Sequence, residues 1–515
     1  MSKDYKYVGK RKDIATVRDI RAYELNAVWL GVPLLLLMEN AGKSIADYIK
    51  YRMNGDVQDK EVYIFVGKGG NGGDGLVAAR HLASMGAKVF IILVYRENEI
   101  EHPDTRFNLN IIKHMDRSVK LLRLDAINEP LKSDILIDAM LGVGVKGKPR
   151  EPIASAIKLF NESEGFKVAV DVPTGVDPDT GHVAGMAVKA DVTITFHKIK
   201  PGLIRAREYV GEVIVVDIGI PPEAEIYVGP GDVKVKVPRK PIDAHKGVGG
   251  RIVVIGGSEL YTGAPALAAM ASLRTGADLA FVLAPQRVAN IIASYSPNII
   301  SYGFKGEYFT EEVVDEVLGY VEKLRPHSVV IGPGLGLNES TKTFTLSVLK
   351  DLVQRNDIKG IVVDADALKH LAGANIDLRG KVVLTPHRRE LSILLNLDVE
   401  EELQDRIQKC ILASKTYNAI TLLKGHIDVI CYGEDYRLNK TGTPAMSVGG
   451  TGDVLSGIIA SLIARGVNLY EAAQIAAYIN GRAGELATNT LGERITATDL
   501  LDYVPKVFIE AENMH

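Results

Sequence analysis

The sequence predicts two α/β domains in tandem, and three observations support this. The chain has 515 residues, more than a single hydrophobic core usually organises. In both halves, short apolar runs alternate with segments long enough for helices, which is typical of parallel sheets covered by helices. Around Gly219–Pro222, prolines and glycines interrupt the alternation. We therefore expect domains at residues 1–225 and 226–515.

The first half contains six apolar runs that suit strands buried on both faces. Such strands, separated by helical segments, predict a doubly wound parallel sheet. The runs are residues 62–66, 89–94, 135–138, 168–172, 192–196 and 213–216.

The second half begins after a connector and repeats the same alternation. In the connector, Val and Lys alternate over Val233–Pro238, which predicts a short strand. Seven further strands are expected at residues 252–255, 279–283, 329–331, 361–363, 382–384, 420–423 and 429–431. Two long helices, residues 452–464 and 470–488, are expected to complete the domain.

Composition excludes several classes of protein. A formal net charge of -3 provides no global field for nucleic acid or an anionic membrane. Cys410 and Cys431 form no C-x-x-C pair, which argues against zinc and a disulfide framework. The N-terminus lacks a signal-peptide core, and the apolar run Val32–Met38 is too short to span a bilayer. We expect a cytoplasmic protein with no nucleic-acid or membrane partner.

The segment Gly449–Asp453 carries the strongest chemical signal. Three glycines precede an acid and an apolar helix, so free backbone N–H groups at the helix N-terminus can bind a phosphate. Phosphoryl transfer needs such an anion site and a base near the attacking hydroxyl, and Asp453 can be that base. An ordinary first-turn acid that stabilises the helix is the alternative.

Glycine-rich or polar loops follow five other predicted strands. The carboxyl ends of parallel strands are where α/β sheets bind ligands. The loops contain Gly256–Pro265, Gly332–Gly336, Asp364–Leu368, Thr385–Glu390 and Lys424–Asp428. A single such loop could be a simple turn, but five together indicate a site.

These motifs resemble those of the ribokinase-like superfamily, and specifically its ADP- or ATP-dependent NAD(P)H-hydrate dehydratases, from about Ala244 to Asp499. The shared motifs include G-P-G-L-G, D-A-D-A-L, L-T-P-H, L-L-K-G and G-G-T-G-D-V-L-S-G. The resemblance implies a ribokinase-like domain that phosphorylates the ring hydroxyl of the S form of hydrated NAD(P)H. Phosphate then leaves, giving NAD(P)H and AMP. The substrate is expected to contact Ala264, Gly336, His387 and Asp453. ADP, with ATP as the alternative, is expected with Mg²⁺ at Lys424, Gly425, His426, Ile427, Asp428 and Gly452.

The first half has its own glycine loop, Gly67–Gly75, between a strand and a predicted helix at residues 76–85. It can hold an anion but matches neither a Walker loop nor the dinucleotide fingerprint. Asn71, Asp138 and Thr174 offer hard oxygen ligands, which suit an alkali or alkaline-earth cation. Simple turn formation is the alternative for these residues.

This half resembles the NAD(P)H-hydrate epimerases over residues 14–220, through M-E-N-A-G, N-G-G-D-G, D-A-x-L-G-x-G, D-V-P-T-G-V-D and K-P-G. The resemblance implies a Rossmann-like domain that interconverts the R and S hydrates. It implies K⁺ near Asn71, Asp138 and Thr174. Asp171 is the first candidate for the catalytic acid or base, and Lys200 is the second. The implied substrate contacts are Gly70, Asn71, Gly72, Gly73, Asp74, Gly142, Val143, Gly144, Val145, Lys146, Gly147, Lys148 and Asp171.

Together the halves predict a bifunctional repair enzyme for hydrated NADH and NADPH that assembles as a homo-oligomer. Two other functions remain open at this point. The second half could be a kinase of a sugar or a hydroxymethylpyrimidine, because these share the anion site and the base. The first half could be a binding module like those of messenger-RNA decapping scaffolds, although it retains Asp138 and Asp171.

Overall fold

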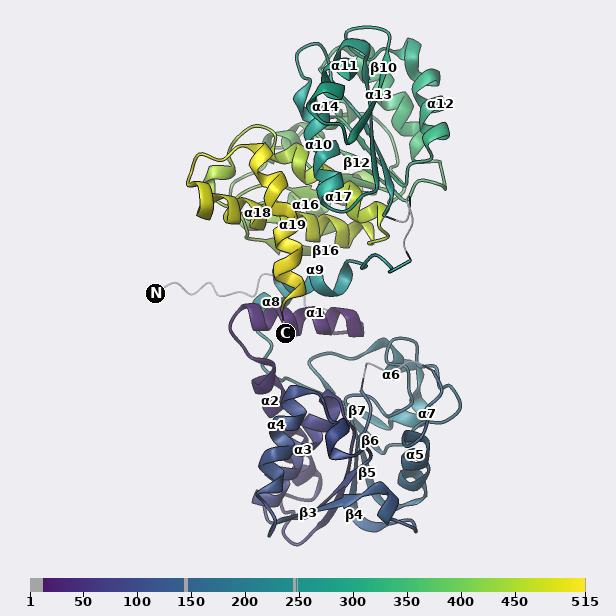
Figure 1. Ribbon diagram of the computed structural model, residues 1–515, viewed down its shortest axis with the longest axis vertical. Coiled ribbons are helices and arrows are strands. Elements are labelled where there is room, and N and C mark those ends of the chain that lie inside the picture. Colours follow the sequence, from purple (N-terminus) through teal and green to yellow (C-terminus); the bar gives the residue numbers. More distant parts are fainter. Residues whose placement is uncertain (1–12, 143–146, 244–246, 248, 515) are drawn as a thin grey trace. The chain divides into compact units, whose positions relative to one another are not determined.

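The computed structural model describes residues 13–142, 147–243, 247 and 249–514. They form two compact units, Arg11–Ala224 (the N-terminal unit) and Glu225–His515 (the C-terminal unit). Each unit is a sheet with helices on both faces (Figure 1), so the predicted α/β class is confirmed in both.

The N-terminal unit is built on seven parallel strands in the order β3-β2-β1-β4-β5-β6-β7. From β1 the strand order runs toward one edge of the sheet through β2 and β3 and toward the other edge through β4 to β7. A ligand-binding crevice is expected at this switch point, at the carboxyl ends of β1 and β4. The strands are β1 (Glu61–Val66), β2 (Lys88–Leu93), β3 (Val119–Arg123), β4 (Lys132–Ala139), β5 (Glu164–Val170), β6 (Val192–Phe196) and β7 (Glu212–Val216). The helices are α1 (Val17–Trp29), α2 (Leu34–Arg52), α3 (Gly70–Ser84), α4 (Pro103–Lys113), α5 (Ile153–Glu162), α6 (Pro201–Arg205) and α7 (Arg207–Val210), and α8 (Pro222–Ile226) follows at the boundary.

Alternate residues of β1 are buried in different cores of this unit. Ile64 and Val66 pack in the larger cluster with α2 and α3, whereas Phe65 packs with Phe160 of α5. Burial on both faces explains why the strand is a continuous apolar run.

The C-terminal unit has a nine-stranded sheet in the order β10-β9-β8-β11-β12-β13-β14-β15-β16. It is parallel from β10 to β14 and antiparallel from β14 to β16. The strands are β8 (Arg251–Ile255), β9 (Leu279–Pro285), β10 (Ile299–Phe304), β11 (Ser328–Ile331), β12 (Gly360–Val363), β13 (Val382–Leu384), β14 (Ile420–Leu423), β15 (Asp428–Tyr432) and β16 (Asp435–Asn439).

Helices α10, α17, α18 and α19 pack over one face of this sheet, and α12, α13 and α14 over the other. The helices are α9 (Pro230–Lys236), α10 (Gly263–Arg274), α11 (Gln286–Tyr295), α12 (Val314–Leu324), α13 (Glu339–Leu352), α14 (Asp366–Leu371), α15 (Arg388–Leu395), α16 (Leu403–Tyr417), α17 (Thr451–Ala464), α18 (Leu469–Leu491) and α19 (Ala497–Glu512).

The strand predicted at Val233–Pro238 was wrong, because this segment belongs to α9. Pro230 starts the helix and the Asp232 carboxylate accepts a hydrogen bond from Gly229 N at 3.0 Å. Val233 and Lys236 are buried, and their three-residue spacing fits a helix as well as the alternation fits a strand. Six residues were too few to decide between the two periods.

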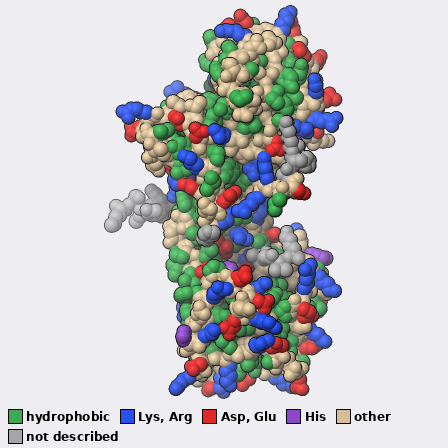
Figure 2. All heavy atoms as spheres, in the orientation of Figure 1, with side chains coloured by type: hydrophobic (Ala, Val, Ile, Leu, Met, Phe, Trp, Pro, Cys, Tyr) green, Lys and Arg blue, Asp and Glu red, His purple; other side chains and the backbone are tan. Residues whose placement is uncertain are grey.

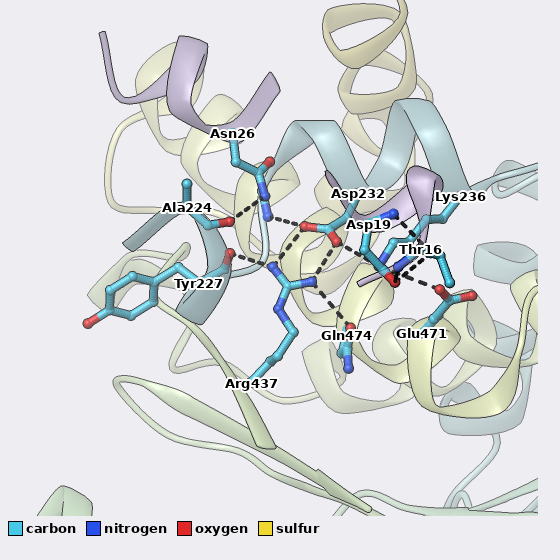
Figure 3. Close-up of polar contacts among 11 residues, drawn as sticks. Thr16, Asp19, Asn26, Ala224, Tyr227, Asp232, Lys236, Arg437, Glu471 and Gln474 are labelled. Atoms are coloured by element: carbon cyan, nitrogen blue, oxygen red, sulfur yellow. Dashed lines mark hydrogen bonds and ion pairs between the residues drawn. The ribbon is translucent and has the colours of Figure 1, made fainter. Parts of the chain in front are cut away.

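A buried ionic cluster fixes α9 within the C-terminal unit (Figure 3). Arg437 of β16 donates to both oxygens of Asp232, at 2.5 and 3.0 Å. Lys236 lies 3.3 Å from Asp232 and 3.5 Å from Glu471. Since Asp232 is fully buried, its charge depends on these two cations.

Candidate functional site

The first corner of the candidate site lies where the chain enters α17. Gly450 caps the helix with a φ of +96°, and a Cβ there would lie 2.6 Å from Leu267 of α10. Thr451, Gly452 and Asp453 form the first turn, whose N–H groups have no helical partner. The start of α17 therefore has the free backbone N–H groups that the predicted anion site requires, and Asp453 lies in the same turn.

Asp453 is a carboxyl group with an altered acidity. Burial and the negative charge of Asp364 raise its pKa to about 7, although the ammonium of Lys424 acts in the opposite direction. A base with a pKa near neutrality both exists in its ionised form and accepts a proton effectively at ordinary pH. This property suits Asp453 to deprotonating a hydroxyl.

Lys424 contributes its side chain to the same corner. Its Nζ lies 3.2 Å from Asp364 Oδ1 and 3.4 Å from the position that a Cβ on Gly452 would occupy. Burial alone would lower the pKa of Lys424, but the carboxylates of Asp364, Glu390 and Asp453 raise it above its usual value. A permanent positive charge thus lies beside the N-terminus of α17.

Asp364 holds that charge in place. Its Oδ1 accepts a hydrogen bond from Thr385 Oγ1 at 2.8 Å, and its Oδ2 accepts one from Ser456 Oγ at 2.6 Å. The sequence singled out the loop that contains Asp364 but assigned it no role. Its position directly after β12, at the same sheet edge as Lys424, was the available signal.

The loop after β14 is closed by Asp428. Its Oδ1 accepts a hydrogen bond from Gly425 N at 2.9 Å, and its Oδ2 accepts one from Asn439 Nδ2 at 2.9 Å. Burial raises the pKa of Asp428 to about 6. Gly425 and His426 at the tip are exposed, so Asp428 shapes the turn and leaves the tip open to a ligand.

The residues expected to contact the hydrated substrate come from three neighbouring loops. Ala264 is in the first turn of α10, 3.6 Å from where a Cβ on Gly334 would lie. Gly336 has a φ of +83° and donates its N–H to Asp366 Oδ2 at 3.0 Å. Asp366 also acts electrostatically on Asp453, which relates this loop to the first corner.

His387 has a structural function in addition to any ligand contact. Its Nδ1 accepts the N–H of Glu390 at 3.2 Å and caps α15, and its backbone pairs with Lys424. Burial lowers the pKa of His387, although Glu390 opposes this. About half of the side chain is exposed, which leaves the ring accessible to a ligand.

The candidate site of the N-terminal unit is centred on Asp171, where β5 ends. Asp171 adopts a φ of +63°, and its Oδ1 accepts hydrogen bonds from Thr195 Oγ1 and Phe196 N, both at 3.1 Å. Lys200, only 1% exposed, forms an ion pair with the same oxygen. The two acid–base candidates from the sequence are therefore one buried pair. The strand predicted over residues 168–172 ends at Val170, because Asp171 leaves the extended conformation.

Two more carboxyl groups act on this pair. Burial, together with Asp171 and Glu24, raises the pKa of Asp74 well above its usual value. Burial and Asp171 likewise raise the pKa of Glu24 to about 7, and Lys200 opposes the rise. Sequence reasoning missed Glu24, which lies on α1, far from any motif. A parallel β-bridge pairs Ile14, which precedes α1, with Ile199, the residue before Lys200.

The glycines of the first-half loop serve two purposes. The loop is the beginning of α3, which starts at Gly70, six residues before the predicted helix. A Cβ on Gly72 would overlap the Gly67 carbonyl, and one on Gly75 would lie 2.5 Å from Ala139, so these two glycines allow close packing. Gly69 has open space around it, and the N-terminus of α3 is accessible to an anion there.

Asn71, Asp138 and Thr174 lie together. Asp138 Oδ1 accepts from Thr174 Oγ1 at 2.7 Å, its Oδ2 accepts from Thr174 N at 2.8 Å, and Asn71 Nδ2 donates to Val170 O at 2.8 Å. Burial raises the pKa of Asp138 to about 6, and no lysine or arginine of the described residues pairs with it. A fully buried carboxyl beside several carbonyl and hydroxyl oxygens has the donor set that an alkali or alkaline-earth cation prefers. Among the described residues, no three His, Cys, Asp or Glu side chains form a metal cluster.

Gly142 approaches Asn71 so closely that a Cβ would overlap its amide oxygen. The loop that follows was expected to contact the substrate. Of that loop, Gly147 and Lys148 are described, whereas Val143, Gly144, Val145 and Lys146 lie outside the described residues.

The distribution of charge on the surface and the hydropathy of the helices are relevant to nucleic-acid and membrane partners. On the face shown in Figure 2, acidic and basic side chains are interspersed. Of the helices in the described part of the chain, none combines the length and apolar character needed to cross a bilayer.

Two family models match this chain in sequence. One, described as NAD(P)H-hydrate dehydratase, matches residues 252–506, and one described as YjeF-related protein N-terminus matches residues 35–202. The bifunctional NAD(P)H-hydrate repair enzyme Nnr of Hyperthermus butylicus is 43% identical, over 98% of this chain and 94% of that protein. Its namesake in Methanothermobacter thermautotrophicus is also 43% identical, over 95% and 94%. The ADP/ATP-dependent NAD(P)H-hydrate dehydratase of Bacillus subtilis, co-crystallised with ATP and Mg²⁺, gives a TM-score of 0.48 at 26% identity, over 56% of this chain and 98% of that one.

Proposed function

Because the chain belongs to the family of bifunctional NAD(P)H-hydrate repair enzymes, we propose that its two sites act in sequence on hydrated NADH and NADPH. The N-terminal unit interconverts the R and S hydrates, and the C-terminal unit dehydrates the S form with ADP. The observation that supports the second step most directly is Asp453, a carboxyl with a pKa of about 7 in the first turn of α17, beside the ammonium of Lys424.

In the C-terminal unit, Asp453 takes the proton of the ring hydroxyl while the hydroxyl oxygen attacks the terminal phosphorus of ADP. AMP leaves with the electron pair of the broken P–O bond. The new phosphate ester then leaves as phosphate with the C–O electron pair, and loss of a ring proton restores the double bond. Phosphorylation is required because hydroxide is a poor leaving group.

The protein's part in this transfer is mainly electrostatic. Lys424 and the N–H groups of α17 neutralise the phosphate, and the open tip Gly425–Ile427 holds the rest of the nucleotide. Asp364 is engaged by Lys424, Thr385 and Ser456, so Mg²⁺ would be held mainly by the phosphates and water, adding positive charge there when bound. Ala264, Gly336 and His387 position the hydrated ring.

In the N-terminal unit, Asp171 is the residue that exchanges a proton with the substrate. Lys200 forms an ion pair with Asp171 in a buried setting that also contains Asp74 and Glu24. K⁺ would be held by Asp138, Asn71 and Thr174, where it would supply the positive charge that Asp138 lacks.

A single assay tests the proposal. The protein is mixed with hydrated NADH and either ADP or ATP, and the near-ultraviolet absorbance of NADH is followed. We expect absorbance to return with ADP, and both epimers to be consumed. A stable phosphorylated product without NADH would instead show an ordinary small-molecule kinase.

A further inference from the structure

Arg406 of α16 carries a positive charge that is buried without an ion pair. Its side chain is only 8% exposed, and among the described residues no carboxylate pairs with it. Within the same part of the chain, its guanidinium makes a single hydrogen bond, from Nη2 to the Lys424 carbonyl at 3.4 Å. Burial lowers the pKa of Arg406, and Asp428 is the acid that most strongly opposes this. A charge held in this way costs free energy that no close partner offsets.

Another arginine of this unit shows how a structural guanidinium is satisfied. Arg465 lies at the C-terminal end of α17, and it too has no ion pair among the described residues. However, its Nη1 donates to the Thr275 carbonyl at 2.8 Å and its Nη2 to the Pro238 carbonyl at 2.6 Å. These two short bonds connect α17 with two other segments. Arg406 has no comparable set of bonds, so fold stability does not account for its burial.

The guanidinium of Arg406 lies directly against the loop that follows β14. A Cβ on Gly425 would lie 2.3 Å from Nη2, 2.8 Å from Cζ and 3.1 Å from Nη1 of Arg406. Gly425 does not adopt a positive φ, so the guanidinium, and not the backbone conformation, requires glycine at this position.

The peptide group between Lys424 and Gly425 is held at both ends. Its carbonyl accepts the bond from Arg406, and its N–H donates to Asp428 Oδ1 at 2.9 Å. Because Gly425 is itself exposed, this peptide borders the open tip of the loop. A positive charge without a protein counter-ion therefore lies against a loop that is accessible to an anionic ligand.

We propose that Arg406 is a positioning residue for the nucleoside diphosphate: its guanidinium fixes the peptide between Lys424 and Gly425 and adds positive charge next to the phosphates. This inference rests on the proposed function, which assigns the loop to ADP. The bound phosphates supply the counter-charge that the described part of the protein does not place beside Arg406. Fixing this peptide also fixes the origin of the Lys424 side chain, whose ammonium lies beside the N-terminus of α17.

ADP binding to the full chain, measured by titration calorimetry, tests this inference independently of catalysis. Arg406→Met should raise the Kd for ADP about 10-fold, because a positive charge in a partly desolvated site is lost. It should not lower the midpoint of thermal unfolding, because no ion pair is broken and a buried charge is removed. Arg406→Lys keeps the charge and should raise the Kd less. Arg465→Met is the matched control, which should lower the unfolding midpoint and leave the Kd unchanged.

A second pair of variants tests the contact with the loop. Gly425→Ala places a methyl group against the guanidinium and should weaken ADP binding at least as much as Arg406→Met does. Combining the two substitutions removes the clash, so the double variant should bind ADP no more weakly than Arg406→Met alone. Losses of affinity that simply add in the double variant would overturn the assigned contact.

The remaining outcomes separate this inference from the proposed function. An unchanged Kd for ADP in Arg406→Met overturns the inference. A rise in Kd that comes with a fall in unfolding midpoint as large as that of Arg465→Met also overturns it, because Arg406 is then a structural cation. If the parent protein binds ADP but restores no NADH from its hydrate, the proposed function fails, and the Kd comparison still decides the role of Arg406.

Discussion

The ammonium of Lys424 lies 3.2 Å from the carboxylate of Asp364, which is itself held by two hydroxyl groups. This arrangement divides the roles of two nearby acids. Asp364 is fully engaged and fixes a cation at the N-terminus of α17. Among the described residues, Asp453 has no such hydrogen-bond partners, and its pKa is raised to about 7. The site therefore contains one structural carboxylate and one that can exchange a proton.

The first prediction concerns Asp453. Asp453→Asn should lower kcat for dehydration by about 10²- to 10⁴-fold, because the general base is lost. In the parent protein, the rate should fall as the pH drops below about 7, because protonation removes the base. The pH profile of dehydration measures this effect. Epimerisation by the variant, followed by the interconversion of the two hydrates, is the internal control and should be unchanged. Dehydration that is independent of pH between 5 and 8 would contradict this role.

The second prediction concerns the buried pair of Asp171 and Lys200. Lys200→Met leaves the Asp171 carboxylate buried without its cation, which should cost about 3–5 kcal/mol of stability and abolish epimerisation. Trp29 is the only tryptophan of the chain and lies in the N-terminal unit, so its fluorescence reports on unfolding of that unit.

A double variant separates stability from chemistry at this pair. Asp171→Asn with Lys200→Met removes both charges of the pair and should recover most of the lost stability, yet remain inactive as an epimerase. Recovery of epimerisation in the double variant would remove Asp171 from the mechanism. Dehydration of the S form should continue in both variants.

Sequence reasoning was reliable where the physics is local. Continuous apolar runs identified β1 and β12, because strands buried on both faces leave a strong signal. The edge strands β3, β10 and β16 were missed, since partly exposed strands mix polar with apolar residues. The strand predicted in place of α9 was wrong because buried Val233 and Lys236 satisfy both periods.

The candidate site shows the same limit. Asp453 and Asp171 lie in glycine-rich motifs and could be identified from the sequence. The pairing of Lys200 with Asp171, and of Lys424 with Asp364, depends on which strand ends adjoin, and that follows only from the order of the strands. Glu24 acts through a helix with no motif, so no pattern in the sequence points to it.

The third prediction tests the cation site. K⁺ should activate epimerisation. It should also raise the free energy of unfolding of the N-terminal unit, followed by Trp29 fluorescence, by about 2.7 kcal/mol at a hundred times its Kd. Na⁺ or choline at the same ionic strength should do so less. Asp138→Asn should abolish the response to K⁺ in both measurements. Dehydration should not respond to the exchange of cations if the site lies only in the N-terminal unit.

The fourth prediction concerns the buried cluster on α9. Asp232→Ala leaves the Arg437 guanidinium, 8% exposed, without its carboxylate, and should destabilise the C-terminal unit by about 3–5 kcal/mol. Calorimetry should show the shift, while the Trp29 transition stays in place. Asp502→Ala, which breaks an exposed pair with Arg274, is the matched control and should cost less than about 1 kcal/mol. Similar losses of stability in both variants would show that the buried cluster contributes no more to stability than an exposed ion pair does.

The fifth prediction uses the raised pKa of Glu24, about 7 against an ordinary 4.5. A carboxyl whose pKa rises on folding is destabilising in its charged form, so its favourable contribution is complete below pH 4.5 and is lost as the pH rises to about 7. Glu24→Gln should therefore match the parent protein at pH 4 and be more stable by about 1–3 kcal/mol at pH 8, at about 1.4 kcal/mol per pKa unit. Urea unfolding followed by Trp29 fluorescence measures the difference. The charges that also act on this region are those of Arg21, Asp74, Asp171 and Lys200. The control is Asp47→Asn, which removes a carboxylate at an exposed position of α2 and should show no such pH dependence. A stability difference that is constant from pH 4 to pH 8 would mean that Glu24 is ionised throughout and that its burial does not govern its charge.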